Sequence, residues 1–112
     1  MKKSTEKIDE FQKCAFYVAA IMENLKKIRR RYSFNQDEFA SIVGVCRATI
    51  SKWERGVSAP TIYQAMVLHI IERASWDFET RKKMKSSLYS EGPIQSLYYA
   101  LNYVDKLDRA KL

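Results

Sequence analysis

The hydrophobic residues of this chain recur at intervals of three and four positions, which is the spacing of amphipathic helices. Stretches that alternate at every second residue, as strands require, are nearly absent. The pattern predicts the following helices: 5–32, 36–43, 46–55, 62–73, 76–88 and 94–107. The first of them could also be two helices that join near residues 18–22. We therefore predict an all-α fold.

Residues that favour helix ends stand at the expected boundaries. Asn35 is a good N-cap, and Glu38 three residues later completes a sequence typical of a capping box. Gly44 ends that short helix, because glycine accepts the left-handed conformation that follows a helix. Thr61 can cap the fourth helix, and Pro93 suits the first turn of the last one.

Two hydrophobic stripes lie in the outer segments of the chain. Their members are Ile8, Phe11, Ala15 and Val18 in the first stripe and Ile94, Leu97, Leu101 and Val104 in the second. An exposed stripe promotes aggregation, so each must be covered. The stripes could cover each other, or each could pair with the same element of a second chain. We expect the second arrangement, and expect Tyr98, Tyr99 and Tyr103 to lie in the core or at that interface.

The chain is basic, with 20 Lys and Arg against 13 Asp and Glu among 112 residues. A net charge of +7 attracts polyanions, whether nucleic acid, an anionic membrane or an acidic protein, and charge alone does not choose among them. The longest apolar run, residues 14–22, is too short to span a bilayer. We expect a cytoplasmic protein with no membrane partner.

The chain has little equipment for catalysis or metal binding. Cys14, Cys46 and His69 are too few and too far apart for a structural zinc site. No glycine-rich phosphate loop and no nucleophile motif is present. We predict that the protein is not an enzyme and needs neither a metal nor a cofactor. We expect reduced thiols, with Cys46 buried and unreactive.

The most informative stretch is residues 35–56, which reads as two short helices joined by a tight turn. Ala40 is small where the helices must cross, and Gly44 permits the turn. Cys46, Ile50 and Trp53 share one side of the second helix. Small residues and hydrogen-bond donors occupy the opposite side, namely Ala48, Ser51, Lys52 and Arg55. Such a face can enter the major groove of DNA.

This stretch resembles the Cro/CI-type helix-turn-helix family, also called the XRE family. The likeness covers about residues 25–71 and rests on an ordered set of positions: Leu25, Ile28, Arg29, Gln36, Phe39, Ala40, Gly44, Val45, Thr49, Ile50, Ser51, Trp53, Glu54, Gly56 and Pro60. Two positions depart from the family pattern. Ser33 replaces the usual glycine before the second helix, and Cys46 stands where Ser or Thr normally caps the recognition helix.

The resemblance implies a set of DNA contacts. Gln36 would bind a backbone phosphate, and the base edges would be read by Arg47, Ala48 and Lys52. Phosphate or shape contacts are implied for Thr49, Ser51 and Arg55. The resemblance also implies that Arg29 and Glu54 pair across the helices in a structural role.

From this resemblance we expect a compact helical domain with a central helix-turn-helix and flanking helices. Residues 1–24 would be an N-terminal helical extension, 25–73 the DNA-binding domain, and 74–112 C-terminal helices that dimerise. The expected function is a homodimeric repressor that binds a palindromic operator in double-stranded DNA.

One alternative is the antitoxin of a toxin–antitoxin pair, which binds a toxin protein and represses its own operon. The protein partner would then be a toxin. If the protein is a simple repressor, its possible protein partner is an anti-repressor. An RNA-binding protein is less favoured, because no RNA-binding motif is recognised. A second basic run on residues 81–85 is most simply a solvated face, with a second DNA contact as the other reading.

Overall fold

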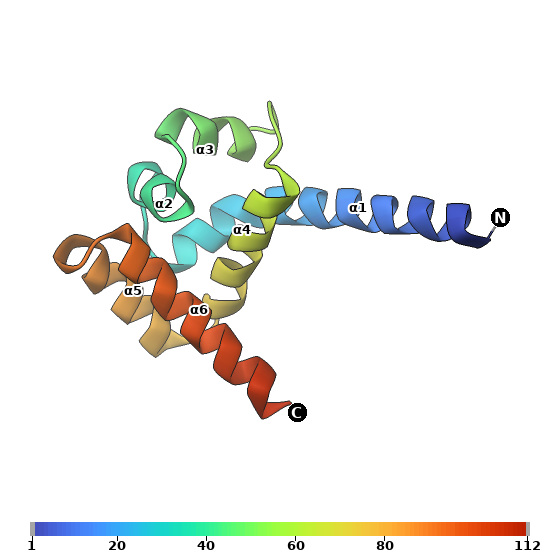
Figure 1. The fold of residues 1–112 in the computed structure, drawn as a ribbon. Coiled ribbons are helices and arrows are strands. Elements are labelled where there is room, and N and C mark those ends of the chain that lie inside the picture. Colours follow the sequence, from blue (N-terminus) through green and yellow to red (C-terminus); the bar gives the residue numbers. More distant parts are fainter. Residues whose placement is uncertain (1, 112) are drawn as a thin grey trace.

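The computed structural model describes residues 2–111, with side chains from residue 12 onward. This part of the chain forms α1 (Lys2–Arg31), α2 (Gln36–Val43), α3 (Arg47–Glu54), α4 (Ile62–Ala74), α5 (Phe78–Ser90) and α6 (Pro93–Ala110). Figure 1 shows α1 as one long rod whose N-terminal half projects from the body made by the other helices. The all-α prediction is confirmed. Because α1 is unbroken, the alternative of two joined helices is wrong.

Side-chain caps fix several of the helix starts. Asn35 and Glu38 form the expected capping box at α2, and Thr61 forms a second one with Gln64 at α4. Helix α5 begins later than predicted, because the Asp77 side chain accepts the Thr80 backbone N–H and so defines the N-cap. Local hydrogen bonds of these side chains therefore set where α2, α4 and α5 begin.

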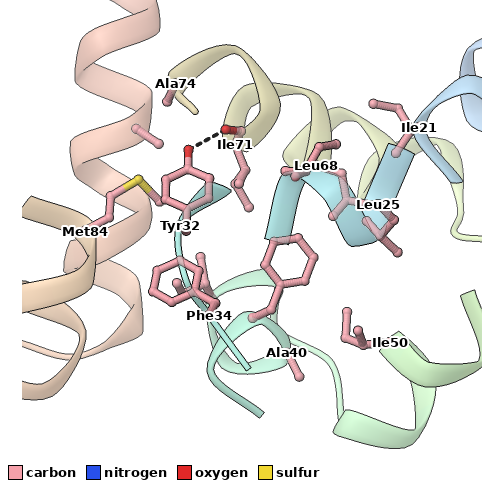
Figure 2. Close-up of a cluster of buried hydrophobic side chains, with 14 of the residues drawn as sticks. Ile21, Leu25, Tyr32, Phe34, Ala40, Ile50, Leu68, Ile71, Ala74 and Met84 are labelled. Carbon is pink, nitrogen blue, oxygen red and sulfur yellow. Dashed lines mark hydrogen bonds between the residues drawn. The ribbon is translucent and has the colours of Figure 1, made fainter. Parts of the chain in front are cut away.

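Buried side chains from all six helices meet in one core. Its members include Leu25 and Ile28 of α1, Phe39 of α2, Ile50 of α3, Leu68 and Ile71 of α4, Met84 of α5 and Ala100 of α6. In Figure 2 a dashed line joins the Tyr32 hydroxyl to the Ile71 backbone carbonyl, to which it donates, and this bond satisfies the phenol inside the core. Helices α5 and α6 thus complete the core beneath α1–α4.

Small residues allow α6 to lie close to α5. Ser96 and Ala100 are fully buried, and the Ser96 hydroxyl donates to the Met84 carbonyl at 2.9 Å. This packing divides the predicted C-terminal stripe. Val104 is buried with the core, whereas Ile94 is 86% exposed.

The structure describes the side chains of only two members of the N-terminal stripe. The side chains of Ile8 and Phe11 lie outside the described residues, while Ala15 is exposed and Val18 is half-buried. Further along α1, the helix packs against α4 and α3. None of the helices described in residues 2–111 is both long and apolar enough to cross a membrane.

Candidate nucleic-acid interface

Helices α2 and α3 form a helix pair with a tight turn between them. Gly44 adopts a φ of 86°, and its N–H donates to the Ala40 carbonyl at 2.9 Å. The Val45 N–H donates to the same carbonyl at 3.0 Å. Ala40 is only 3% exposed, and its small side chain lets the two helices approach closely. The turn therefore sets the angle at which α3 leaves α2.

The inner face of α3 is anchored in the core. Ile50 is fully buried and Trp53 is 3% exposed. Trp53 thus has the core role that its position in the pattern predicts. With its inner side held in this way, α3 must present its opposite side to solvent.

The opposite side of α3 is the exposed polar face expected from the sequence. Arg47, Ala48, Lys52 and Arg55 are exposed, and Ser51 is half-buried. The structure thus brings these predicted DNA contacts onto one face.

Two of the predicted contacts on α3 are already engaged within the helix. The half-buried Thr49 has its hydroxyl 3.2 Å from the Cys46 sulfur, so it is turned toward the start of the helix. The Arg55 guanidinium donates through Nε to the Ser51 carbonyl at 3.3 Å. Thr49 is therefore the predicted contact residue that the structure directs away from the exposed face.

A bidentate ion pair joins α3 to α1. Arg29 donates through Nε to Glu54 Oε2 at 2.8 Å and through Nη2 to Oε1 at 3.0 Å. A third N–H of Arg29 donates to the Phe34 carbonyl at 3.0 Å. The side chains are 13% and 6% exposed, so solvent screens this pair little. Arg29 thus ties together α1, the loop before α2, and the end of α3.

The charges of this pair are mutually supported. Burial disfavours ionisation of Glu54, but the hydrogen bonds and charge of Arg29 outweigh it and hold the Glu54 pKa below its usual value. The hydrogen bond to Glu54 likewise raises the pKa of Arg29. Both groups are therefore ionised at neutral pH.

Gln36 bridges the beginning of α2 to both ends of α3. Its Nε2 donates to Glu54 Oε1 at 3.4 Å, and its Oε1 accepts from Arg47 Nε at 3.5 Å. Arg47 also lies 3.7 Å from the Asp37 carboxylate. These contacts are long, so they orient the two side chains without holding them strongly. Asp37 was not among the residues predicted for the site, although its charge in the first turn of α2 is the signal that could have indicated a contact with Arg47.

Cys46 differs from the expectation of a buried, unreactive thiol. The side chain is exposed, and it makes no capping hydrogen bond to the first turn of α3. The contact with the Thr49 hydroxyl lowers the pKa of the thiol. A residue at an N-cap position stands at the surface edge of its helix, which explains why the helical-wheel argument placed it wrongly.

Comparison with protein families gives a match over this region. Residues 25–66 match the model of a helix-turn-helix family. This segment is a helix-turn-helix domain of the XRE type. The match supports a DNA-binding regulator of transcription. No curated protein and no solved structure matches the chain. The matched residues of the helix-turn-helix domain include α2, α3 and the Arg29–Glu54 pair that binds α3 to α1.

Proposed function

We propose that the protein is a repressor that binds a palindromic operator as a homodimer, with α3 in the major groove. The exposed face of α3 carries this proposal, because it combines one small residue with cationic donors. Lys52 and Arg47 can donate to guanine edges, and Ala48 leaves room for a thymine methyl group. These three positions would supply the sequence preference.

Contacts to the DNA backbone would come from the start of α2. The N–H groups at a helix N-terminus favour an anionic phosphate, and Gln36 stands at that end of α2. The contacts from Gln36 to Glu54 and from Glu54 to Arg29 would orient this side chain relative to α3. In this role Gln36 positions the protein and carries no sequence information.

A second copy of the chain would complete the operator complex. One recognition helix reads only a few base pairs, whereas a two-fold dimer places two of them about 34 Å apart on one face of the DNA. The proposed interface therefore has to lie beside α3. Helices α1 and α4 meet this requirement, because α1 packs against both α3 and α4. Exposed apolar side chains are available on them, such as Phe16, Tyr63 and Met66.

A footprint of the purified protein on the DNA upstream of its own gene tests the proposal. We expect two protected half-sites and an affinity whose logarithm falls linearly with the logarithm of salt concentration, by about 0.9 per phosphate contacted. Lys52→Ala should cost about 1–3 kcal/mol at one base position and relax the preference there. Lys83→Ala removes the same charge from an exposed position on α5 and is the matched control.

The possible outcomes test the base contact, the dimer and the binding to DNA separately. Equal losses for Lys52→Ala on operator and random DNA would leave backbone binding but remove the assigned base contact. A single protected half-site would contradict the dimer. No binding to any duplex from the locus, at any salt concentration, would contradict repression of its own gene.

A further inference from the structure

A basic hollow of about 480 Å³ lies between the C-terminal end of α1 and the outer side of α5. We call it the α1–α5 hollow. Its lining contains four cationic side chains, namely Arg31, Arg81, Lys82 and Lys85, and no carboxylate among the described residues. Figure 1 shows α5 at the end of the molecule away from α3. The hollow is therefore separate from the proposed DNA-reading face.

Two guanidinium groups of the hollow are held by the same loop residue. Arg31 donates through Nη1 to the Ser75 hydroxyl at 3.0 Å, and Arg81 donates through Nη1 to the Ser75 carbonyl at 2.7 Å. The Arg31 guanidinium also lies 3.9 Å from the centroid of the Trp76 ring. Each guanidinium has further N–H groups beyond the one bound to Ser75. The two are thus pre-positioned for a shared anion.

Protein carboxylates balance this charge only in part. Lys85 lies 3.2 Å from Glu38, but no described carboxylate forms an ion pair with the other three cations. Asp77 precedes α5, and its pKa is lowered mainly by its hydrogen bonds to Thr80, with a smaller contribution from the charge of Arg81. Asp77 is occupied in capping α5. The hollow therefore keeps an excess of positive charge.

The remaining lining groups suit a ligand with both polar and flat parts. Ser33 and Ser86 place hydroxyl groups at the hollow, and Phe78 places there a ring that is 64% exposed. Ser33 has a φ of 59°, in the left-handed region that a serine seldom adopts. Lys85 holds the Ser33 carbonyl at 2.6 Å. This bond holds the loop that carries Ser33 at the edge of the hollow.

We propose that the α1–α5 hollow binds a small phosphorylated molecule that carries a planar ring, with a nucleotide as the test case. Arginine side chains match phosphate oxygens in a bidentate manner. The Phe78 ring offers a stacking surface for the planar part. The volume falls within the about 300–1,000 Å³ typical of small-molecule sites, which favours such a ligand over an acidic protein segment.

A titration of the ¹⁵N-labelled full chain with ADP, followed by NMR, tests the proposal without DNA and so independently of the proposed function. We expect saturable shifts at the amides of Ser33, Lys82 and Ser86 and at the indole N–H of Trp76. Inorganic pyrophosphate should shift the same amides with lower affinity, because it lacks the ring.

Two charge-matched variants on α5 sharpen the result. Lys82 lines the hollow and Lys83 does not, although both are exposed. Lys82→Gln should weaken ADP binding about threefold or more, as the loss of one charged contact predicts, whereas Lys83→Gln should leave the affinity unchanged. Among the side chains of residues 12–111, neither lysine ammonium donates a hydrogen bond to another residue, so both variants should keep the wild-type spectrum elsewhere.

Several results would overturn the proposal. They are an absence of shifts at millimolar ADP, shifts centred on α3 (Arg47–Glu54), and equal weakening of ADP binding by both variants. A hexaglutamate peptide that shifts the hollow amides when ADP does not would also overturn it, and would point to an acidic protein partner.

Discussion

Glu54, at the end of α3, accepts two hydrogen bonds from Arg29, near the end of α1, at 2.8 and 3.0 Å. Glu54 lies 25 positions after Arg29 along the chain, and the pair holds the end of the recognition helix α3 against α1. Removal of one partner leaves the other charge half-buried without compensation. The pair is therefore a better test of the fold than any exposed ion pair.

We predict that Glu54→Ala destabilises the protein by about 3 kcal/mol, well above the ~1 kcal/mol of a surface pair. Arg29→Ala should cost a similar amount, because it strands Glu54. The double variant should be clearly more stable than the sum of the two losses implies. Urea unfolding of the four proteins measures this, and strict additivity would mean that the two residues do not interact. Asp105→Ala, which breaks the exposed pair with Arg109, is the control.

The same pair predicts a dependence of stability on pH. The Glu54 pKa is lowered in the folded state, so its contribution is complete above the ordinary value of 4.5 and is lost as pH falls through the lowered pKa. The free energy of unfolding of the wild type should therefore exceed that of Glu54→Gln at pH 7, and the gap should shrink below about pH 4.5. Other carboxylates titrate in the same range, so the difference between the two proteins is the quantity to measure. A gap that stays constant down to pH 3 would contradict the assignment.

The sequence predicted the parts of this structure that depend on local rules. Asn35 and Thr61 cap helices, and Gly44 closes the turn, because each acts within a few residues of its own position. Periodicity records neither the N-cap position that exposes Cys46 nor the capping bond of Asp77 that sets the late start of α5. The α1–α5 hollow joins side chains from distant segments, such as Arg31 and Arg81. Only the tertiary fold brings these side chains together around one hollow.

Ser33 provides a test of backbone strain. Its φ of 59° suits glycine, the residue usual in the family at this position. Ser33→Val should destabilise the protein by about 1–3 kcal/mol, because a β-branched side chain resists this conformation. Ser33→Gly should leave stability nearly unchanged, since relief of strain offsets the greater freedom of glycine in the unfolded chain. Thermal unfolding distinguishes the two, and equal effects of Val and Gly would refute the backbone explanation.

Cys46 provides a test of helix capping. Its thiol makes no capping bond to α3, whereas a serine hydroxyl at the same position can accept an N–H of the first turn. Cys46→Ser should therefore raise the melting temperature by a few degrees. Cys14→Ser changes the other exposed thiol, in the interior of α1, and should not raise it. An unchanged melting temperature for Cys46→Ser would show that the start of α3 is already satisfied in another way.

The dimer interface can be tested with surface variants. Deletion of residues 93–112 would be ambiguous, because it also removes Ser96 and Ala100 from the core. Charges on exposed side chains avoid that problem. Tyr63, at the start of α4, is 78% exposed, and Leu101, on the outer face of α6, is 44% exposed.

We expect the wild type to be a dimer by light scattering at tens of micromolar, and Tyr63→Glu to be a folded monomer, because the charge would be buried without a partner in the proposed α1–α4 interface. Leu101→Glu should remain dimeric, since α6 packs on α5, α4 and α2 and lies away from α3. The reverse result would move the interface to the C-terminal helices, in agreement with the expectation from the sequence. A wild type that stays monomeric at this concentration would contradict both assignments. The monomeric variant should also lose the cooperative protection of two half-sites while keeping weak, salt-dependent binding to DNA, because each copy retains its own α3.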